Sequence, residues 1–239
     1  MRPLRLEILV EDRSGAMIVE ALLRKEIERL ARKIAPHQAV HIEAYVRPHQ
    51  GLGHFPEHPE KKPSPMAGGL LNQLPAKLRA YERFQKHTPC LLLLCFDSDE
   101  HDPDQMRARV EQLIQENAPN LRTVIGIAIE ELEAWILGDE LAIQAAYPHY
   151  DRMLYEAYEQ DSVGHTWERL CHILEGDKAE RIIEEDYPTS GRYKTQWAAR
   201  ISPELDPERN VSPSWQAFRR ATVRALKEAL RDLSKEAKT

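Results

Sequence analysis

Carboxylate side chains directly follow three separate apolar stretches of this 239-residue chain. They are Glu11 after the first stretch, Asp97 and Asp99 after the second, and Glu130, Glu131 and Glu133 after the third. Carboxylates that lie close together repel one another, and a bound divalent cation removes that repulsion. Oxygen ligands favour Mg²⁺ or Mn²⁺ over softer metals. These residues are therefore candidates for a metal site, provided that the fold brings them together.

The pattern of apolar residues predicts how the acids are positioned. Alternating or continuous apolar residues predict strands at 5–10, 40–46, 89–96 and 123–129. Amphipathic helices are predicted at 14–33, 70–85 and 104–117. This alternation predicts an α/β fold with a Rossmann-like parallel sheet flanked by helices. The carboxyl ends of such strands meet at one edge of the sheet, so we expect the acids to meet there.

The chain changes character near residue 140. Residues 1–140 form the predicted α/β domain, which contains a long loop rich in Pro, Gly and His at 47–69. Residues 141–239 are predicted to be a helical C-terminal extension that packs on this core. The sequence thus indicates a single sheet domain with added helices.

The predicted last helix, 214–233, lies in a basic part of an acidic chain. Residues 192–231 hold nine Lys and Arg against four Asp and Glu, whereas the whole chain has a formal net charge of −6. That net charge argues against coating of DNA by the whole surface. Two interpretations of the helix stay open: it caps the sheet with solvated charges, or its cations contact a phosphate backbone.

Composition restricts where the chain is expected to work. No apolar run approaches the ~20 residues that a membrane-spanning helix needs, and no secretion signal is recognised at the N-terminus. Three cysteines without a C-x-x-C pair argue against a disulfide framework. We therefore expect a cytoplasmic protein with no membrane partner.

Three segments together resemble the TOPRIM domain of topoisomerases, primases and OLD-family nucleases. They are VEDRSG at 10–15, LLLLCFDSDEHD at 91–102 and IEELEAWILGD at 129–139. The order, a glutamate after the first strand and then a hydrophobic strand followed by D-x-D, is similar to that of TOPRIM. By position, the resemblance implies catalytic roles for Glu11, Asp97, Asp99 and Lys194. It also implies metal binding by Glu11, Asp97, Asp99 and Glu133, with Glu130 competing for the last place.

The resemblance further implies a reaction and partners. More narrowly, the segments resemble a TOPRIM-like family of prokaryotic proteins often encoded beside an ATPase. The implied activity is a phosphodiester hydrolase, a nuclease-like enzyme that uses Mg²⁺ (or Mn²⁺) on nucleic acid. The implied partner is an AAA/ABC-type ATPase in phage defence or DNA repair, and a homodimer is left open.

The sequence departs from the OLD-like pattern at Gly15. That pattern places a second acid four residues after the first, where this chain has glycine. A complete second metal site is therefore in doubt. The alternative, a catalytically weak or inactive TOPRIM-like binding or regulatory subunit, stays open.

Other chemistries fit the residues less well. Haloacid-dehalogenase-type phosphatases place D-x-D after the first strand with Thr or Val four residues after the first Asp, where this chain has His101. Glycosyltransferases also use D-x-D with a metal, but their pattern does not predict Glu11. His54 and His58 have a zinc-ligand spacing for a helix, although Pro56 disfavours a helix there. We interpret these histidines as loop residues.

Overall fold

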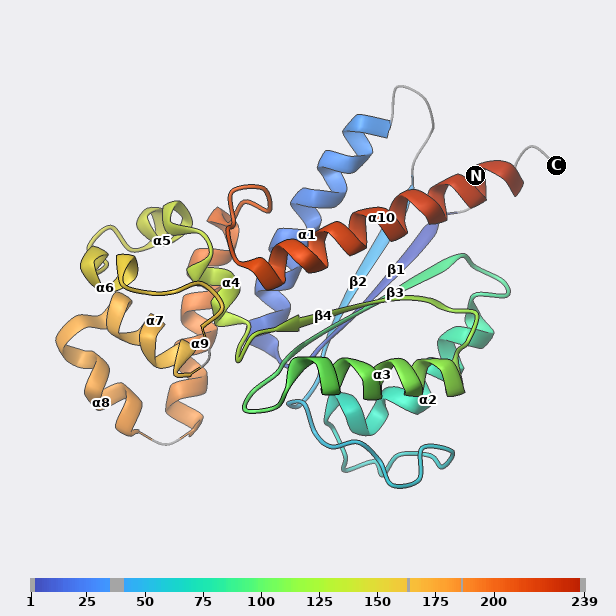
Figure 1. The fold of residues 1–239 in the computed structure, drawn as a ribbon, viewed down its shortest axis with the longest axis horizontal. Coiled ribbons are helices and arrows are strands. Elements are labelled where there is room, and N and C mark those ends of the chain that lie inside the picture. The colour runs from blue at the N-terminus through green and yellow to red at the C-terminus, as the bar shows by residue number, and fades with distance from the viewer. Residues whose placement is uncertain (1–2, 35–40, 163, 186, 237–239) are drawn as a thin grey trace.

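The computed structural model describes residues 3–34, 41–162, 164–185 and 187–236. Within these residues four parallel strands form one sheet in the spatial order β2-β1-β3-β4 (Figure 1). The strands are β1 (Leu4–Val10), β2 (Ile42–Pro48), β3 (Cys90–Asp97) and β4 (Arg122–Ala128). The predicted α/β fold with a parallel sheet is confirmed. In the structure β2 begins at Ile42. Its predicted start, residue 40, lies outside the described residues.

The side chains of β3 alternate between two hydrophobic cores. One core holds Leu91, Leu93 and Cys95, and the other holds Leu92, Leu94 and Phe96. All six are fully buried. A strand covered on both faces needs apolar side chains on both, which explains why this segment is continuously apolar.

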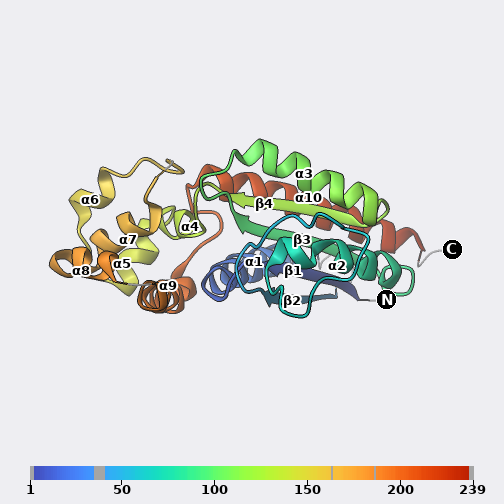
Figure 2. The ribbon, with the colours of Figure 1, turned by 90° about the horizontal axis from the view of Figure 1, so that it is seen from below.

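Two helices cover each face of the sheet (Figure 2). On the face of Leu93 lie α1 (Arg13–Ile34) and α10 (Pro213–Glu236), and on the opposite face lie α2 (Leu70–Phe84) and α3 (Pro103–Asn117). Helix α10 packs closely on β4. A Cβ added at Gly126 in β4 would lie only 2.7 Å from the Phe218 ring of α10. The interpretation of the last helix as a cap on the sheet is confirmed.

The remaining helices gather beyond the carboxyl ends of the strands (Figures 1 and 2). They are α4 (Glu133–Leu137), α5 (Glu140–Ala146), α6 (Arg152–Glu156), α7 (Thr166–Glu175), α8 (Ala179–Glu184) and α9 (Tyr187–Ile201), with short 3₁₀ turns at Gly176–Lys178 and Ser202–Glu204. We call this group the helical lobe. Trp135 in α4 and Trp197 in α9 are fully buried, so these tryptophans belong to the core. A domain boundary at residue 140 stays a prediction, because α10 leaves the lobe and packs on the sheet.

The long loop after β2 is tied to the end of β1. Residues 49–69 contain no helix or strand. The backbone N–H of Gly51 donates to the carbonyl of Glu11 at 3.0 Å, and the N–H of Leu70 donates to the carbonyl of Gly51 at 2.9 Å. The Arg79 guanidinium donates to the carbonyl of Pro59 at 2.7 Å. These bonds fix the loop beside the edge where the acids lie.

The structure shows the state of the three cysteines and whether any described helix could cross a membrane. Cys90, Cys95 and Cys171 are buried free thiols, so no disulfide crosslinks the fold, as predicted. Across the described residues, no helix has both the length and the apolar character needed to cross a bilayer.

Candidate active site

Glu11 and Asp97 meet across two neighbouring strands. Strands β1 and β3 pair in parallel with Val10 opposite Cys95, so the residues that follow both strands leave the sheet at the same edge. The backbone N–H of Asp97 donates to Oε2 of Glu11 at 3.2 Å. The N–H of Glu11 in turn donates to the carbonyl of Cys95 at 3.3 Å. The glutamate is therefore aimed at the D-x-D turn by the sheet itself.

The D-x-D turn is held against the turn that follows β4. The N–H of Ser98 donates to the carbonyl of Ala128 at 3.0 Å, and Ser98 Oγ accepts from the N–H of Glu130 at 2.8 Å. Asp99 donates its N–H to the carbonyl of Glu130 at 2.9 Å. Asp99 and Glu130 both have positive φ, 46° and 58°, an unusual conformation for residues with a side chain. The two turns therefore fix each other.

Asp97 also binds the backbone that leads into α4. Its Oδ1 accepts from the N–H of Leu132 at 2.8 Å. Helix α4 begins at the next residue, Glu133, whose side chain is almost fully buried. A buried carboxylate at a helix start is stabilised by the free N–H groups of the first turn.

Lys194 brings a cation from α9 into this edge of the sheet. Its Nζ lies 3.1 Å from Oε1 of Glu131 and 3.3 Å from Oε2 of Glu133. The structure thus places Lys194 beside the acids, and its catalytic role stays a prediction. Its partner Glu131 is among the candidate acids after the last strand, but the resemblance gives it no role of its own.

Burial and crowding raise the pKa values of the carboxylates. Burial, followed by the charges of Asp99 and Asp12, raises the pKa of Glu11 to about 7, although the N–H of Asp97 lowers it. Burial and then Glu133 raise the pKa of Glu131 to about 8, against the opposing effect of Lys194. The pKa values of Asp97, Asp99 and Glu133 are also raised, and burial is the largest cause for each.

The charge of Lys194 is held in place by the same acids. Burial lowers the pKa of Lys194, but Glu133, Glu131 and Asp97 outweigh burial and keep it well above its ordinary value. One ammonium thus faces several carboxylates. The cluster attracts further positive charge.

Glu130 points away from this cluster and caps α7. Its carboxylate accepts hydrogen bonds from the backbone N–H of His165, from the backbone N–H of Thr166 at 2.7 Å and from the Thr166 hydroxyl. The second oxygen of Glu131 accepts from the N–H of Trp167 at 3.0 Å. Glu130 and Glu133, the two candidates for the last ligand position, therefore have different partners. Glu130 holds the helical lobe, and Glu133 faces Lys194.

Asp12 and Gly15 explain why the first segment offers a single carboxylate. Asp12 accepts from the N–H of Gly15 at 2.7 Å and from the Ser14 hydroxyl at 2.8 Å, which stabilises the start of α1. A Cβ added at Gly15 would lie 2.4 Å from a methyl group of the buried Leu132. An acid at position 15 would have to displace that core side chain.

The donor set fits a hard divalent cation in its chemistry. Glu11, Asp97 and Asp99 offer carboxylate oxygens of the kind that Mg²⁺ and Mn²⁺ prefer. Among the described residues, however, no group of three or more His, Cys, Asp or Glu is already arranged to hold a metal ion. Glu11 and Asp97 instead accept from backbone N–H groups, and Glu133 contacts Lys194. Of the predicted ligands, Glu133 is thus the one that already has a cationic partner.

Comparison with protein families gives a match over most of the chain. The model of a family described as Domain of unknown function (DUF4276) matches residues 10–221. This range begins at the last residue of β1, ends within α10 and includes every acid of the cluster and Lys194. No curated protein and no solved structure matches the chain. Because the matched range covers most of the sequence, the chain belongs to this DUF4276 family.

Proposed function

We propose that this protein is a divalent-metal-dependent phosphodiester hydrolase acting on nucleic acid at the edge formed by Glu11, Asp97 and Asp99. The observation that carries the proposal is the 3.2 Å hydrogen bond from the Asp97 N–H to Oε2 of Glu11. It joins two acids that are far apart in the sequence. The position of this pair after adjacent parallel strands is where ligands bind in open α/β sheets.

The electrostatics of the cluster support a metal role. The raised pKa values of Glu11 and Glu131, about 7 and about 8, mean that protons partly occupy these carboxylates at neutral pH. A divalent cation in contact with Glu11, Asp97 and Asp99 would replace such protons. Bound there, Mg²⁺ or Mn²⁺ would supply Lewis-acid activation of water and stabilise charge on phosphate oxygens.

The protein's own residues supply orientation and charge. The backbone bonds at Asp97 and Ser98 fix where the carboxylates point. Lys194, held by Glu131 and Glu133, adds a positive charge beside the same edge for a negatively charged phosphate. Glu133 therefore acts through Lys194 in this proposal, and the predicted direct contact of Glu133 to metal becomes secondary.

Two measurements test the proposal separately. Thermal stability is followed during Mn²⁺ titration for the parent protein and for Asp97→Ala combined with Asp99→Ala, and we expect metal-dependent stabilisation in the parent alone. Plasmid nicking with Mn²⁺ is then compared between the parent and Glu11→Gln, with cleavage expected to disappear in the variant. Glu100→Gln is the matched control, because Glu100 is an exposed acid of the same turn. Cleavage by Glu11→Gln equal to that of the parent would refute the catalytic role.

A binding or regulatory subunit is the second candidate. Lys194 already compensates Glu131 and Glu133, and the packing of Leu132 against Gly15 leaves no room for the second acid of the OLD-like pattern. This candidate predicts that Mn²⁺ stabilises the parent and the Asp97→Ala plus Asp99→Ala variant equally, and that no nicking occurs. Action with an AAA/ABC-type ATPase in phage defence or DNA repair stays a prediction from the resemblance alone.

A further inference from the structure

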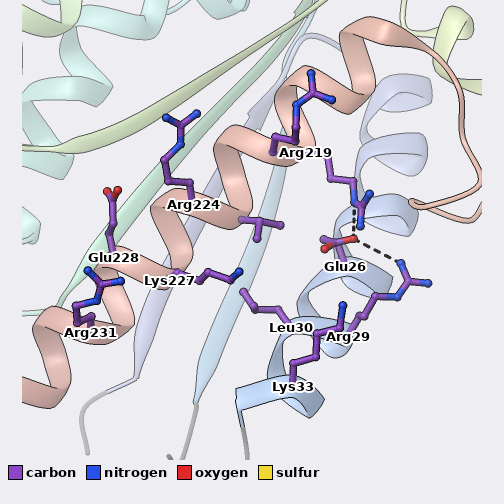
Figure 3. A pocket seen from close by; sticks show the side chains of 11 residues that line it. Glu26, Arg29, Leu30, Lys33, Arg219, Arg224, Lys227, Glu228 and Arg231 are labelled. Carbon is purple, nitrogen blue, oxygen red and sulfur yellow. Dashed lines mark hydrogen bonds and ion pairs between the residues drawn. The ribbon is translucent and has the colours of Figure 1, made fainter.

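A groove runs between α1 and α10 on the face of the sheet that these helices cover (Figure 3). Its volume is about 460 Å³. Its walls carry cations from both helices: Arg29 and Lys33 from α1, and Arg219, Arg220, Arg224, Lys227 and Arg231 from α10. The remaining lining residues are Glu26, Leu30, Val223 and Glu228. The groove is therefore strongly basic in a chain whose net charge is negative.

Most of these cations have no partner among the described residues. In the part of the chain that the structure describes, no ion pair or side-chain hydrogen bond involves Lys33, Arg220, Arg224, Lys227 or Arg231. The four from α10 are exposed and recur three or four residues apart, so they form one stripe about 16 Å long. Like charges in a row repel one another, and an anionic ligand would relieve that repulsion.

At the end of the groove nearer the carboxyl ends of the strands, a buried glutamate lies beside two arginines. The buried Glu26 accepts a hydrogen bond from Nε of Arg219 at 2.7 Å, and Nη1 of Arg29 lies 3.6 Å from the same carboxylate. That Nη1 atom is buried, yet within the described residues it has no hydrogen-bond partner. An unsatisfied buried donor costs free energy, which an oxygen acceptor from a ligand would recover.

The groove also has an apolar floor. Leu30 is buried, so the apolar surface that the groove offers to a ligand is that of the partly buried Val223. No aromatic residue lines the groove. Apolar contact between flanking cations suits an amphipathic segment whose leucine-like side chains face the floor and whose acids face the walls.

The groove is separate from the acidic edge of the sheet. Helix α1 begins beside Glu11 and rises about 1.5 Å per residue, so Glu26 lies about 20 Å and Lys33 about 30 Å from its start at Arg13. A ligand in the groove would therefore leave the candidate active site open. The groove does not depend on the proposed hydrolase activity.

We infer that the α1–α10 groove is a docking site for an acidic amphipathic helix of a partner protein. Carboxylates of that helix pair with Lys33 and Lys227, whose ammonium groups point into the space between the two helices (Figure 3), and its apolar face packs on Val223. Nucleic acid is the weaker fit on two observations. Part of the lining is apolar, and it lacks the aromatic platforms that single strands stack on. Glu26 and Glu228 in the lining also disfavour a continuous phosphate backbone.

Fluorescence anisotropy with a labelled peptide tests this inference. The probe is a peptide of about 14 residues of leucine and glutamate, with leucines at helical spacing. A second peptide of the same composition lacks that spacing, and short duplex and single-stranded DNA are run in parallel at ~0.15 M salt. We expect the helical peptide to bind more tightly than the scrambled peptide and than either DNA.

Charge reversal locates the binding. Lys33→Glu combined with Lys227→Glu should weaken binding of the helical peptide at least about tenfold. Lys178→Glu combined with Arg181→Glu, two exposed cations of the helical lobe, should change it less than about twofold. All four positions are exposed, and equal melting temperatures would verify that both variants fold. The inference is overturned if both variants bind equally, if spacing makes no difference, or if the groove variant loses DNA binding alone.

Discussion

The ammonium group of Lys194 in α9 lies 3.3 Å from a carboxylate oxygen of Glu133 at the start of α4. Glu131 lies on the same nitrogen at 3.1 Å. The helical lobe thus supplies the cation that faces the acids of the sheet edge. Any change in how the lobe packs would alter the charge balance of the candidate site.

Removal of this cation should destabilise the protein most at alkaline pH. In Lys194→Met, Glu131 and Glu133 lose their partner, and breaking such a buried pair costs about 3 kcal/mol. Protonation of the two glutamates reduces that cost at low pH, so the loss should be smaller at pH 5 than at pH 8. Urea denaturation at both pH values measures it. Lys178→Met, at an exposed position, is the control, and equal stabilities of the two variants at pH 8 would contradict the buried-pair description.

The parent protein itself should lose stability as pH rises from about 4.5 to about 8. The pKa of Glu11 is raised to about 7 and that of Glu131 to about 8, from ordinary values of 4.5. Groups with raised pKa bind protons more tightly in the folded state, so their contribution is complete below 4.5 and lost as they ionise. We expect the free energy of unfolding to decrease across this window in metal-free buffer.

Two variants distinguish this loss of stability between pH 4.5 and pH 8 from the effects of other titrating groups. Glu11→Gln should flatten the pH dependence, whereas Glu100→Gln should leave it unchanged. The pKa of Glu7 is lowered, because hydrogen bonds from Arg47, Arg5 and Tyr81 outweigh its burial, so its contribution is lost only at pH below 4.5. A stability that stays flat between pH 5 and pH 8 in the parent would show that the acids are not crowded in solution.

Gly15 should resist substitution because of its contact with Leu132. In Gly15→Ala the added Cβ meets a Leu132 methyl group at 2.4 Å, and such overpacking costs about 1–3 kcal/mol. Leu132→Ala alone should also be destabilising, because it leaves a cavity. In the double variant the two defects partly offset each other, so its loss should be smaller than the sum of the single losses. Thermal or urea unfolding of the four proteins measures the cycle, and strict additivity would mean that the two residues do not clash.

The local pattern of the sequence determined the elements of the sheet. The unbroken apolar run of β3 and the helical spacing of the segments that became α1, α2 and α3 predict their structure, because periodicity is a property of neighbouring residues. The alternation of strands and helices also predicts parallel pairing and the edge where the acids gather. Glu11, Asp97 and Asp99 could therefore be singled out without a structure.

The partners of buried charges could not be read from that pattern. Glu7 stands in the middle of β1 and is fully buried, yet nothing next to it in the sequence marks it as unusual. Arg47 from β2 binds it at 2.5 Å, and the Tyr81 hydroxyl from α2 donates to it at 2.9 Å. These contacts come from distant elements, so only their packing creates them.

The same holds for the three glutamates after β4. From the sequence alone, Glu130, Glu131 and Glu133 are similar candidates for the site. The tertiary structure gives them different partners. The positive φ of Glu130 turns its carboxylate to the start of α7, whereas Glu131 and Glu133 face Lys194. Residue types and their periodicity fix which elements form, because these depend on local backbone preference and burial. Which charges then face each other depends on long-range packing, because desolvation allows a buried carboxylate only where a donor or cation reaches it.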